Sequence, residues 1–254
     1  MCARYTLRTT AAVIEKLFEV DDVPVLPPRF NIAPSQAVLG IVEEDGVRAA
    51  RLFQWGLVPS WAKDLSSRQR LINARSETLS EKPAFRAALR YRRCLIPADG
   101  YYEWRTEEIP IERRPKAPPI QLNLFGNTDL GAGLPDPKVA VKAARQPYWV
   151  HLDDDRPFAF AGLWERWSGG DGSVLETCAI LTTEPSERVR GLHDRMPAIL
   201  TPESWGAWLD VKGSPAASVQ GLLRSYEGGD LVVHRVTTRV NSVVYDAADC
   251  VSPV

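Results

Sequence analysis

The chain has 254 residues, with 31 lysines and arginines against 32 aspartates and glutamates, so its formal net charge is −1. That length allows one large or two small domains with a substantial core. A nearly neutral chain is not typical of a protein that coats nucleic acid indiscriminately, although it leaves room for a local basic cleft. No long apolar run follows Arg4 and Arg8, and no stretch reaches the roughly 20 apolar residues of a membrane span. We therefore expect a cytoplasmic protein with no membrane contact.

The cysteines argue against two common kinds of site. The four cysteines lie far apart in the chain, at Cys2, Cys94, Cys178 and Cys250. No histidine stands at metal-ligand spacing from any of these cysteines. This usage predicts neither a zinc site nor a disulfide framework. We expect no metal and no cofactor.

The first half of the chain predicts mixed elements. A helix capped by Thr9 or Thr10 should run to about Val20, and a second should begin near Pro83. A hairpin is predicted from Gln36–Val42 and Val47–Trp55, with its turn at residues 44–46. Two short strands are predicted further along, at Cys94–Pro97 and Tyr101–Trp104.

Residues 105–146 break this pattern. They hold nine prolines or glycines beside charged residues and show no sustained period, which is typical of a surface insert. Further strands and helices are predicted after the insert: Tyr148–Leu152, Phe158–Trp164, Val174–Thr182 and Leu231–Val236 as strands, with Pro202–Leu209 and Ala216–Tyr226 as helices. The sum predicts an α+β fold, rich in antiparallel strands, in one compact domain that carries the insert.

The start of the chain suggests unusual chemistry. If aminopeptidase removes Met1, Cys2 carries both a free α-amine and a thiol, which can attack one carbonyl carbon and close a five-membered ring. An α-amine has a pKa of about 7.7–8.0, so part of it is unprotonated near neutral pH. The thiol needs help from its surroundings to act as a thiolate. Taken alone, a Met-Cys start is more often an accident of a disordered terminus.

Three further side chains are candidates for proton handling and positioning. Glu103 lies within Tyr-Tyr-Glu-Trp, and desolvation raises the pKa of a carboxyl group toward the range useful for proton transfer. Asn73 follows two aliphatic residues and could orient an oxygen atom, and His193 beside Asp194 is the best general acid of the three histidines. Each has an ordinary alternative: a salt-bridged strand glutamate, a turn asparagine, and a structural histidine.

Cations and aromatic rings accompany these candidates. Arg4, Arg75 and Arg195 each lie within two residues of one of them, and a guanidinium can make two parallel hydrogen bonds to a phosphate. Trp61 and Trp104 could stack on bases. Tryptophans are nevertheless more often core residues.

Together these motifs resemble one known family, the SOS-response-associated peptidase (SRAP) proteins, whose members crosslink to abasic sites in single-stranded DNA. The motifs occur in the family's order and cover nearly the whole chain outside the insert: Met-Cys-x-Arg, Asn-x-Ala-Pro, Trp-Gly-x-x-Pro-x-Trp, Asn-Ala-Arg-x-Glu-Thr, Tyr-Glu-Trp, Ala-Gly-Leu-Trp and His-Asp-Arg-Met-Pro. The resemblance implies a single SRAP domain over residues 2–254, with a barrel-like strand core and peripheral helices. It also implies a role in replication-coupled repair and the SOS response, as a peptidase or other hydrolase, or as a lyase.

The resemblance also implies residue roles. Cys2 would form a thiazolidine with the ring-opened sugar aldehyde, Asn73 would position the terminal residue, and Glu103 and His193 would handle protons. A larger set would contact the DNA: Arg4, Pro34, Trp61, Arg75, Trp104, Thr182 and Arg195. The partner would be single-stranded DNA containing abasic sites, bound by a monomer at the bacterial nucleoid. One departure is Ala3, where the family usually has glycine, and the added Cβ carries a cost if φ is positive there.

The insert contains a second motif. Gln121-Leu122-Asn123-Leu124-Phe125 resembles the short segment by which bacterial proteins dock on the DNA polymerase sliding clamp. A flexible segment would present Leu124 and Phe125 to an apolar pocket, with Gln121 bonding at its rim. Alternatively, Leu122, Leu124 and Phe125 form a period-2 edge strand packed on the domain.

Two other functions compete with crosslinking. An N-terminal-nucleophile hydrolase or peptidase also exposes a cysteine after Met1 is lost, and uses the amine as a base against an amide. Self-removal of Met1 is the proteolysis most consistent with the sequence. A noncatalytic module that binds single-stranded DNA through the same arginines and tryptophans is the second alternative.

Overall fold

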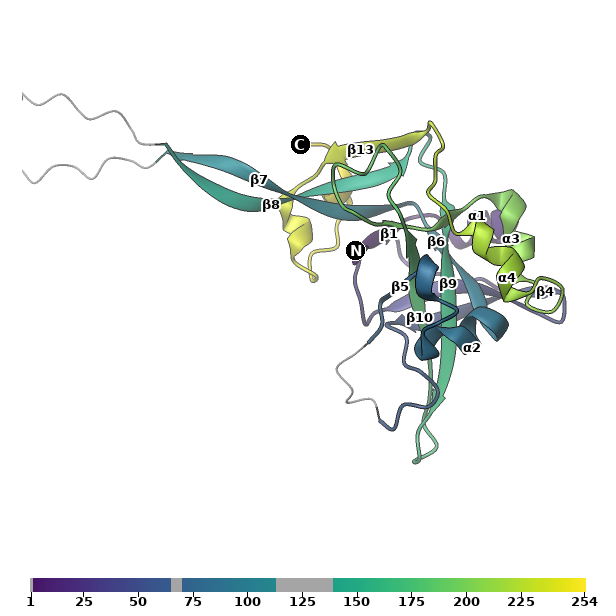
Figure 1. Ribbon diagram of the computed structural model, residues 1–254. Helices are drawn as coiled ribbons and strands as arrows, with labels where there is room; N and C mark the ends of the chain where they lie inside the picture. Colours follow the sequence, from purple (N-terminus) through teal and green to yellow (C-terminus); the bar gives the residue numbers. More distant parts are fainter. Residues whose placement is uncertain (1, 65–69, 113–138) are drawn as a thin grey trace, which may run out of the picture. The chain divides into compact units, whose positions relative to one another are not determined.

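The computed structural model describes residues 2–64, 70–112 and 139–254. The chain divides into two compact units: residues 1–105 together with 147–254, and residues 106–146. Within the described residues the fold is mixed α+β, as predicted (Figure 1). In this part of the chain, no helix is long and apolar enough to cross a membrane.

A closed five-stranded barrel forms the centre of the larger unit. Its strands are β3 (Ala37–Glu44), β4 (Val47–Trp55), β6 (Arg93–Ala98), β9 (Phe158–Ser168) and β10 (Val174–Thr183). Around the ring β10 pairs with β4, β4 with β3, β3 with β6, β6 with β9, and β9 again with β10. Only the β10–β4 contact is parallel. The predicted barrel-like, largely antiparallel core is therefore confirmed.

A tight turn sets the register of the β3–β4 hairpin. Glu44 pairs with Val47, so the loop contains only Asp45 and Gly46, whose φ angles are 51° and 81°. Left-handed angles at both loop residues match the twist of the flanking strands, and Asp-Gly adopts them at low cost. The hairpin predicted here is confirmed.

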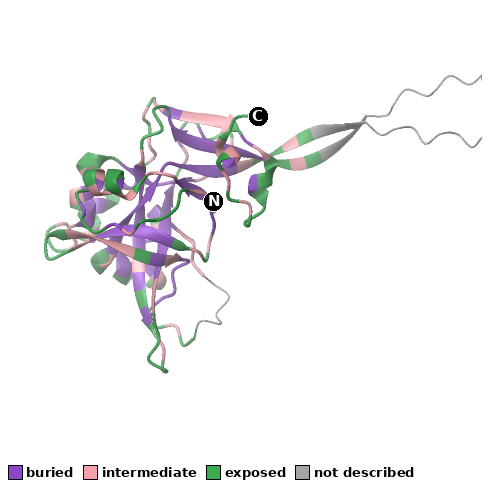
Figure 2. Ribbon diagram, turned by 180° about the vertical axis from the view of Figure 1, so that it is seen from behind, coloured by how far each residue is buried: buried purple, intermediate pink, exposed green. Residues whose placement is uncertain are grey.

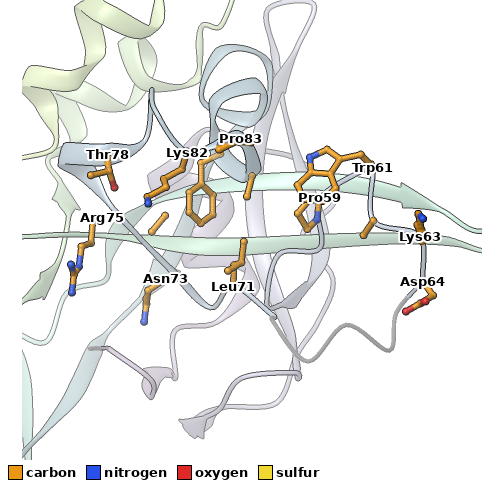
Figure 3. A pocket seen from close by; sticks show the side chains of 14 residues that line it. Pro59, Trp61, Lys63, Asp64, Leu71, Asn73, Arg75, Thr78, Lys82 and Pro83 are labelled. Atoms are coloured by element: carbon orange, nitrogen blue, oxygen red, sulfur yellow. The ribbon is translucent and has the colours of Figure 1, made fainter.

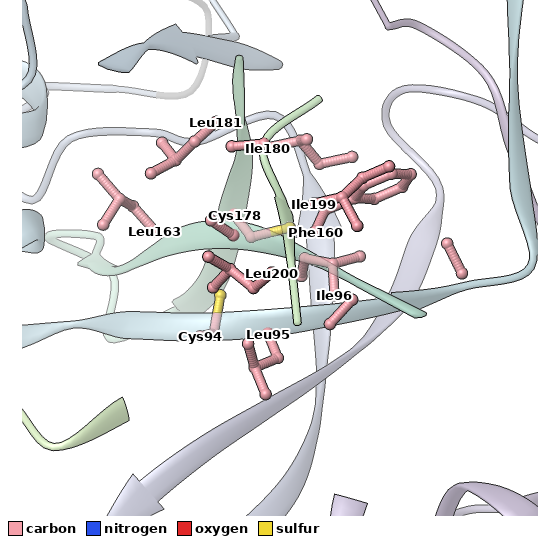
Figure 4. Packing of buried hydrophobic residues seen from close by; sticks show 14 of the residues in the cluster. Cys94, Leu95, Ile96, Phe160, Leu163, Cys178, Ile180, Leu181, Ile199 and Leu200 are labelled. Atoms are coloured by element: carbon pink, nitrogen blue, oxygen red, sulfur yellow. The ribbon is translucent and has the colours of Figure 1, made fainter. Parts of the chain in front are cut away.

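Apolar side chains from the strands fill the barrel (Figure 4). Cys94, Ile96, Phe160 and Cys178 are all fully buried there. The packing is close enough that a Cβ built on Gly162 would lie 2.7 Å from Cys94 Sγ, so a larger residue here would force the Cys94 side chain to shift. Buried residues accordingly concentrate in the strands, as Figure 2 shows.

A second sheet holds the start of the chain. Its strands, in spatial order, are β13 (Leu231–Arg235), β8 (Val139–Leu152), β7 (Gly100–Glu112), β1 (Tyr5–Leu7) and β2 (Arg29–Ile32). Because β1 is hydrogen-bonded on both edges, the residues just before it are held in place as well. Short strands complete the set: β5 (Asn73–Arg75), β11 (Met196–Pro197) and β12 (Ile199–Leu200).

The helices are short. They are α1 (Ala11–Phe18), α2 (Pro83–Tyr91), α3 (Pro202–Leu209) and α4 (Ala216–Val219). Proline stands in the first turn of α2 and α3, where its missing N–H costs nothing. On α3, Trp208 donates its indole N–H to the carbonyl of Cys94 at 2.9 Å, which fixes the helix on β6.

Several predicted bounds are wrong. The helix predicted over 216–226 ends at Val219 and continues only as a 3₁₀ turn over Gln220–Leu222. Regular strand also extends into both ends of the insert, because β7 reaches Glu112 and β8 starts at Val139. These residues form strands because β7 and β8 pair with each other, and local periodicity in the sequence does not reveal such pairing.

Candidate active site

The residues before β1 are tied to the far end of the chain. Arg4 donates through its guanidinium to Asn31 Oδ1 and to the Val240 carbonyl, both at 2.7 Å, and to the Asn241 carbonyl at 3.4 Å. Charged donors make the stronger kind of hydrogen bond. Arg4, predicted to hold phosphate, thus anchors the terminal segment.

Cys2 is held by a second set of contacts. Its side chain is fully buried, and its carbonyl accepts a 2.7 Å hydrogen bond from Asn73 Nδ2. Asn73 lies on β5, which pairs in parallel with β10 through Ile180. Asn73 Oδ1 is buried and has no hydrogen-bond partner among the described residues. Sequence reasoning expected Asn73 to position the terminal residue, and this bond is the contact such a role requires.

The surroundings of Cys2 keep its thiol neutral. Burial raises the pKa of the thiol well above its usual range, and the negative charge of Glu103 raises it further. Glu103 lies on β7 with only 3% of its surface exposed. At neutral pH the sulfur is therefore protonated, and it needs a nearby base before it can act as a nucleophile.

A pocket of about 880 Å³ opens beside this cluster (Figure 3). It includes Asn73 and Arg75 of β5, the start of α2, and the loop that carries Trp61. Trp61 is 68% exposed. Among the described residues, the cations that line the pocket are Lys63, Arg75 and Lys82. An exposed aromatic face among cations is the combination that binds single-stranded nucleic acid.

His193 lies in a different depression. A surface pocket of about 560 Å³ is lined by His193 and Asp194 with Glu184 and Arg190 nearby. The Nδ1 atom of His193 lies between two groups: it accepts a 2.9 Å hydrogen bond from the Arg195 backbone N–H when it carries no proton, and it forms a 2.8 Å ion pair with Asp194 Oδ1 when the imidazole is protonated. These contacts fix the orientation of the imidazole.

Arg195 and Thr182 already have partners inside the protein. Arg195 makes two hydrogen bonds to the Glu77 carboxylate, at 2.7 and 2.9 Å, and a third to the Thr182 carbonyl at 2.7 Å. The paired guanidinium holds the pKa of Glu77 below its usual range. The hydroxyl of Thr182 is buried and donates to the Ala74 carbonyl at 3.4 Å. A phosphate would compete with Glu77 for Arg195.

The remaining predicted residues are spread over the larger unit. Trp104 donates its indole N–H to Asn241 Oδ1 at 2.6 Å, and Asn241 is also a partner of Arg4. Pro34 is half-buried just before Ser35, whose φ is 70°. The clamp motif, residues 121–125, lies outside the described residues.

Comparison with known proteins identifies the family. The SRAP family, described as SOS response associated peptidase, matches residues 1–120 and 137–243. The chain belongs to the SRAP family. It is 37% identical over 247 residues to abasic site processing protein YoqW of Bacillus subtilis, covering 95% of each chain. It is 30% identical to abasic site processing protein HMCES of Mus musculus, covering 89% of this chain and 65% of that relative.

Solved structures agree on the fold. A protein from Bacteroides thetaiotaomicron superposes with a TM-score of 0.77 at 24% identity and covers the whole of both chains. A phage-related protein from Bordetella bronchiseptica gives a TM-score of 0.64 at 26% identity, covering 93% of this chain and 95% of the other. The recognition of the SRAP fold from sequence motifs is confirmed.

This SRAP structure brings some predicted residues together and adds others. Asn73 bonds to the Cys2 carbonyl and Glu103 interacts electrostatically with the Cys2 thiol, although the three residues lie far apart in the sequence. Lys63 and Lys82, which sequence reasoning did not single out, line the pocket with Arg75.

Tyr101 was also missed. It is fully buried, and it shares an electrostatic interaction with both Glu103 and Cys2. The alternation Tyr-x-Glu on a predicted strand was the signal that could have found it, because residues two apart share a face.

Proposed function

We propose that this protein processes abasic sites in single-stranded DNA by forming a covalent thiazolidine between Cys2 and the sugar aldehyde. The observation that carries the proposal is the placement of Cys2: its carbonyl is held by Asn73, a residue that also lines the pocket with Trp61 and Arg75. Relatives named as abasic site processing proteins add support.

The chemistry needs two bond-forming steps. The free α-amine of Cys2 adds to the aldehyde carbon and loses water to give an imine. The thiol then adds to the imine carbon, the C=N electron pair moves to nitrogen, and nitrogen gains a proton. Because amine and thiol belong to one residue, the second step is intramolecular and benefits from a high effective concentration.

Buried charges favour a defined proton path. The Cys2 thiol is neutral at pH 7 because burial and Glu103 raise its pKa. Glu103 is the base that takes the thiol proton during ring closure. His193, held through Nδ1 by Asp194 and the Arg195 backbone, handles protons on the sugar as its ring opens.

The DNA follows the exposed cations and aromatic rings. Bases stack on Trp61, while Arg75 with Lys63 and Lys82 contacts phosphates along the pocket. Pro34 and Trp104 line the path further along, and Arg4 holds the terminal segment in register. Arg195 and Thr182 bind phosphate after Arg195 releases Glu77.

An adduct assay tests the proposal. Protein starting at Cys2 is incubated with a single-stranded oligonucleotide bearing one abasic site, and products are separated under denaturing conditions. We expect a denaturation-resistant adduct that is absent for Cys2→Ala. An adduct that persists in Cys2→Ala would refute the thiazolidine, and ordinary tight binding without any adduct would favour a noncatalytic module.

The same thiol also removes Met1 in this proposal. The Cys2 sulfur attacks the Met1 carbonyl carbon, the C–N bond to Cys2 breaks, and the nitrogen takes up the thiol proton. The resulting thioester is hydrolysed by water, which releases methionine and restores the thiol, so the protein is its own peptidase substrate. Intact mass of protein expressed without aminopeptidase activity should correspond to a chain starting at Cys2 for wild type and at Met1 for Glu103→Gln. Equal processing in both would assign the cleavage to another enzyme.

A clamp contact is a second proposal, and it rests on sequence alone. Gln121, Leu122, Leu124 and Phe125 dock on the DNA polymerase sliding clamp and bring the protein to replicating DNA. Pull-down with purified clamp should retain wild type and lose the Leu124→Ala/Phe125→Ala double variant. Equal retention would refute docking through this segment.

A further inference from the structure

Two tyrosines and Glu103 share one face of the second sheet. Tyr5 of β1 lies directly opposite Tyr101 of β7 in the antiparallel register, and Glu103 follows two residues later on β7. Directly opposite residues, and residues two apart on one strand, point to the same side of a sheet. All three side chains therefore lie on the side of β1 and β7 toward which Phe160 of the barrel packs.

The hydroxyls of both tyrosines are in an unusual state. Each side chain is fully buried, and their rings pack edge-on against Phe160 with centroids 5.8 and 6.1 Å apart. Neither hydroxyl has a hydrogen-bond partner among the described residues. Burying a hydroxyl without a partner is costly, so a packing role alone would be filled better by phenylalanine.

Tyr102, the next residue on β7, provides the contrast. It is equally buried, but its side chain points to the other face, where its hydroxyl donates to the Phe30 carbonyl at 2.6 Å. Strand β7 thus carries, side by side, a tyrosine whose hydroxyl is hydrogen-bonded and a tyrosine whose hydroxyl has no partner among the described residues. The hydroxyl of Tyr102 has a structural use, and that of Tyr101 needs another explanation.

The electrostatic neighbours of Tyr101 supply one. Burial raises its pKa well above the usual range, and the charges of Glu103 and then Cys2 raise it further. Tyr101 therefore keeps its proton and can donate it in a hydrogen bond. Burial also raises the pKa of Tyr5, but its charged neighbours differ: Cys178, Cys2 and Asp99 raise the pKa while Arg29 lowers it.

We propose that Tyr101 is a positioning residue for ring closure at Cys2, donating a hydrogen bond to the negative charge shared by Cys2 and Glu103 when the thiol loses its proton. This inference rests on the proposed function. In the step itself, the S–H bond breaks, the proton passes to a Glu103 oxygen, and the sulfur–carbon bond forms. The C=N pair moves to nitrogen, which takes up a proton, and Tyr101 keeps its own proton throughout.

The test compares three single substitutions that each remove one oxygen: Tyr101→Phe, Tyr102→Phe and Tyr5→Phe. The first readout is the rate of adduct formation with an abasic oligonucleotide. The second is the pH profile of Cys2 alkylation by iodoacetamide, followed on the Cys2 peptide by mass spectrometry. Thermal unfolding checks that each variant is folded.

Tyr101→Phe should slow adduct formation about tenfold or more, as expected for a lost hydrogen bond to a charged group. It should also move the alkylation profile to higher pH, because the thiolate has lost a donor. Tyr102→Phe should leave both readouts at wild-type values, and Tyr5→Phe should move them less than Tyr101→Phe does.

The outcomes separate this inference from the proposed function. Unchanged rate and profile in Tyr101→Phe would overturn it, and so would an equal effect in Tyr102→Phe or Tyr5→Phe. If wild type forms no adduct at all, the proposed function fails. The alkylation profile still decides whether the Tyr101 hydroxyl acts on the thiol.

Discussion

The two halves of the site differ in how they treat charge. Cys2, Tyr101 and Glu103 are at most 3% exposed, whereas Trp61 is 68% exposed and Arg75 and Lys82 face solvent. Asn73 belongs to both, because it lines the pocket and donates to the Cys2 carbonyl. The candidate reactive groups thus form a buried cluster away from water, whereas the side chains that could bind phosphate line a pocket open to solvent.

This division has a physical reason. Charges interact more strongly away from water, so a single carboxylate can control the protonation of a buried thiol. Exposed cations are screened by salt and bind a phosphate chain reversibly. Substitutions in the buried cluster should therefore change rates, and those in the pocket should change affinity and its salt dependence.

The largest expected effect is that of Glu103→Gln. Loss of a general base should slow adduct formation on the order of 100-fold or more. Loss of its negative charge should lower the pKa of the Cys2 thiol, so alkylation by iodoacetamide should become faster near pH 8. Slower adduct formation together with faster alkylation is the result expected if Glu103 is a base that acts on the thiol.

Glu165→Gln provides the matched control. Glu165 is a second buried glutamate, on β9, and it pairs with Arg92 at 2.8 Å. Its loss should lower stability without moving either rate. A parallel fall of both rates in the two variants would attribute the effect of Glu103 to folding.

Trp61→Ala tests the solvent-exposed pocket. Loss of one base-stacking ring should weaken binding of single-stranded DNA by about 1–3 kcal/mol. The alkylation rate of Cys2 should not change. Fluorescence anisotropy with an undamaged oligonucleotide measures the affinity, and Tyr91→Ala, an exposed aromatic residue at the end of α2 outside the pocket lining, is the control. Equal loss in both variants would refute stacking on Trp61.

The pH dependence of stability reports on how well the buried thiols are shielded from water, both at Cys2 and in the barrel core. Burial raises the pKa of the thiols of Cys2, Cys94 and Cys178 above their usual value of about 9. When folding raises the pKa of a thiol, the thiol is neutral in both states below its unfolded-state pKa, and stability does not depend on pH there. Above the unfolded-state pKa, only the unfolded chain loses the proton, so the folded state becomes less stable as the pH rises toward the folded-state pKa. The free energy of unfolding should therefore fall above pH 9, by about 1.4 kcal/mol per pH unit for each thiol.

Urea unfolding at pH 7, 8, 9 and 10 measures this slope. Cys2→Ala should reduce it by the share of one thiol, whereas Arg75→Ala in the pocket should leave it unchanged. A free energy that stays constant through pH 10 would mean that the thiols are not desolvated in the folded protein.

Sequence reasoning found local patterns better than distant contacts. The turn at Asp45-Gly46 and the helix from Pro202 were predictable because each is specified by neighbouring residues. The strand over residues 105–112 was not, since its order comes from pairing with β8. Family motifs grouped Cys2, Asn73 and Glu103, which local rules could not do, and in the fold Asn73 bonds to the Cys2 carbonyl.

The same limit explains the arginines. Arg4 and Arg195 look alike in sequence, each beside a candidate catalytic residue. In the fold, Arg4 bonds to the backbone of Val240, and Arg195 bonds to Glu77. Both partners lie more than a hundred residues away along the chain, so no local pattern could reveal that the predicted phosphate ligands also serve as internal ties.

The smallest expected effect is that of Ala3→Gly, at the boundary between the two halves. Ala3 is not among the described non-glycine residues with positive φ, which are Glu19, Asp22, Ser35, Asp45 and Asp155. The methyl group therefore carries no left-handed strain, and glycine should lower stability by roughly 0.5–1 kcal/mol through the greater freedom of the unfolded chain. Adduct formation by Ala3→Gly should match wild type. Faster adduct formation would show instead that the Cβ obstructs the DNA, and would place Ala3 beside the DNA path.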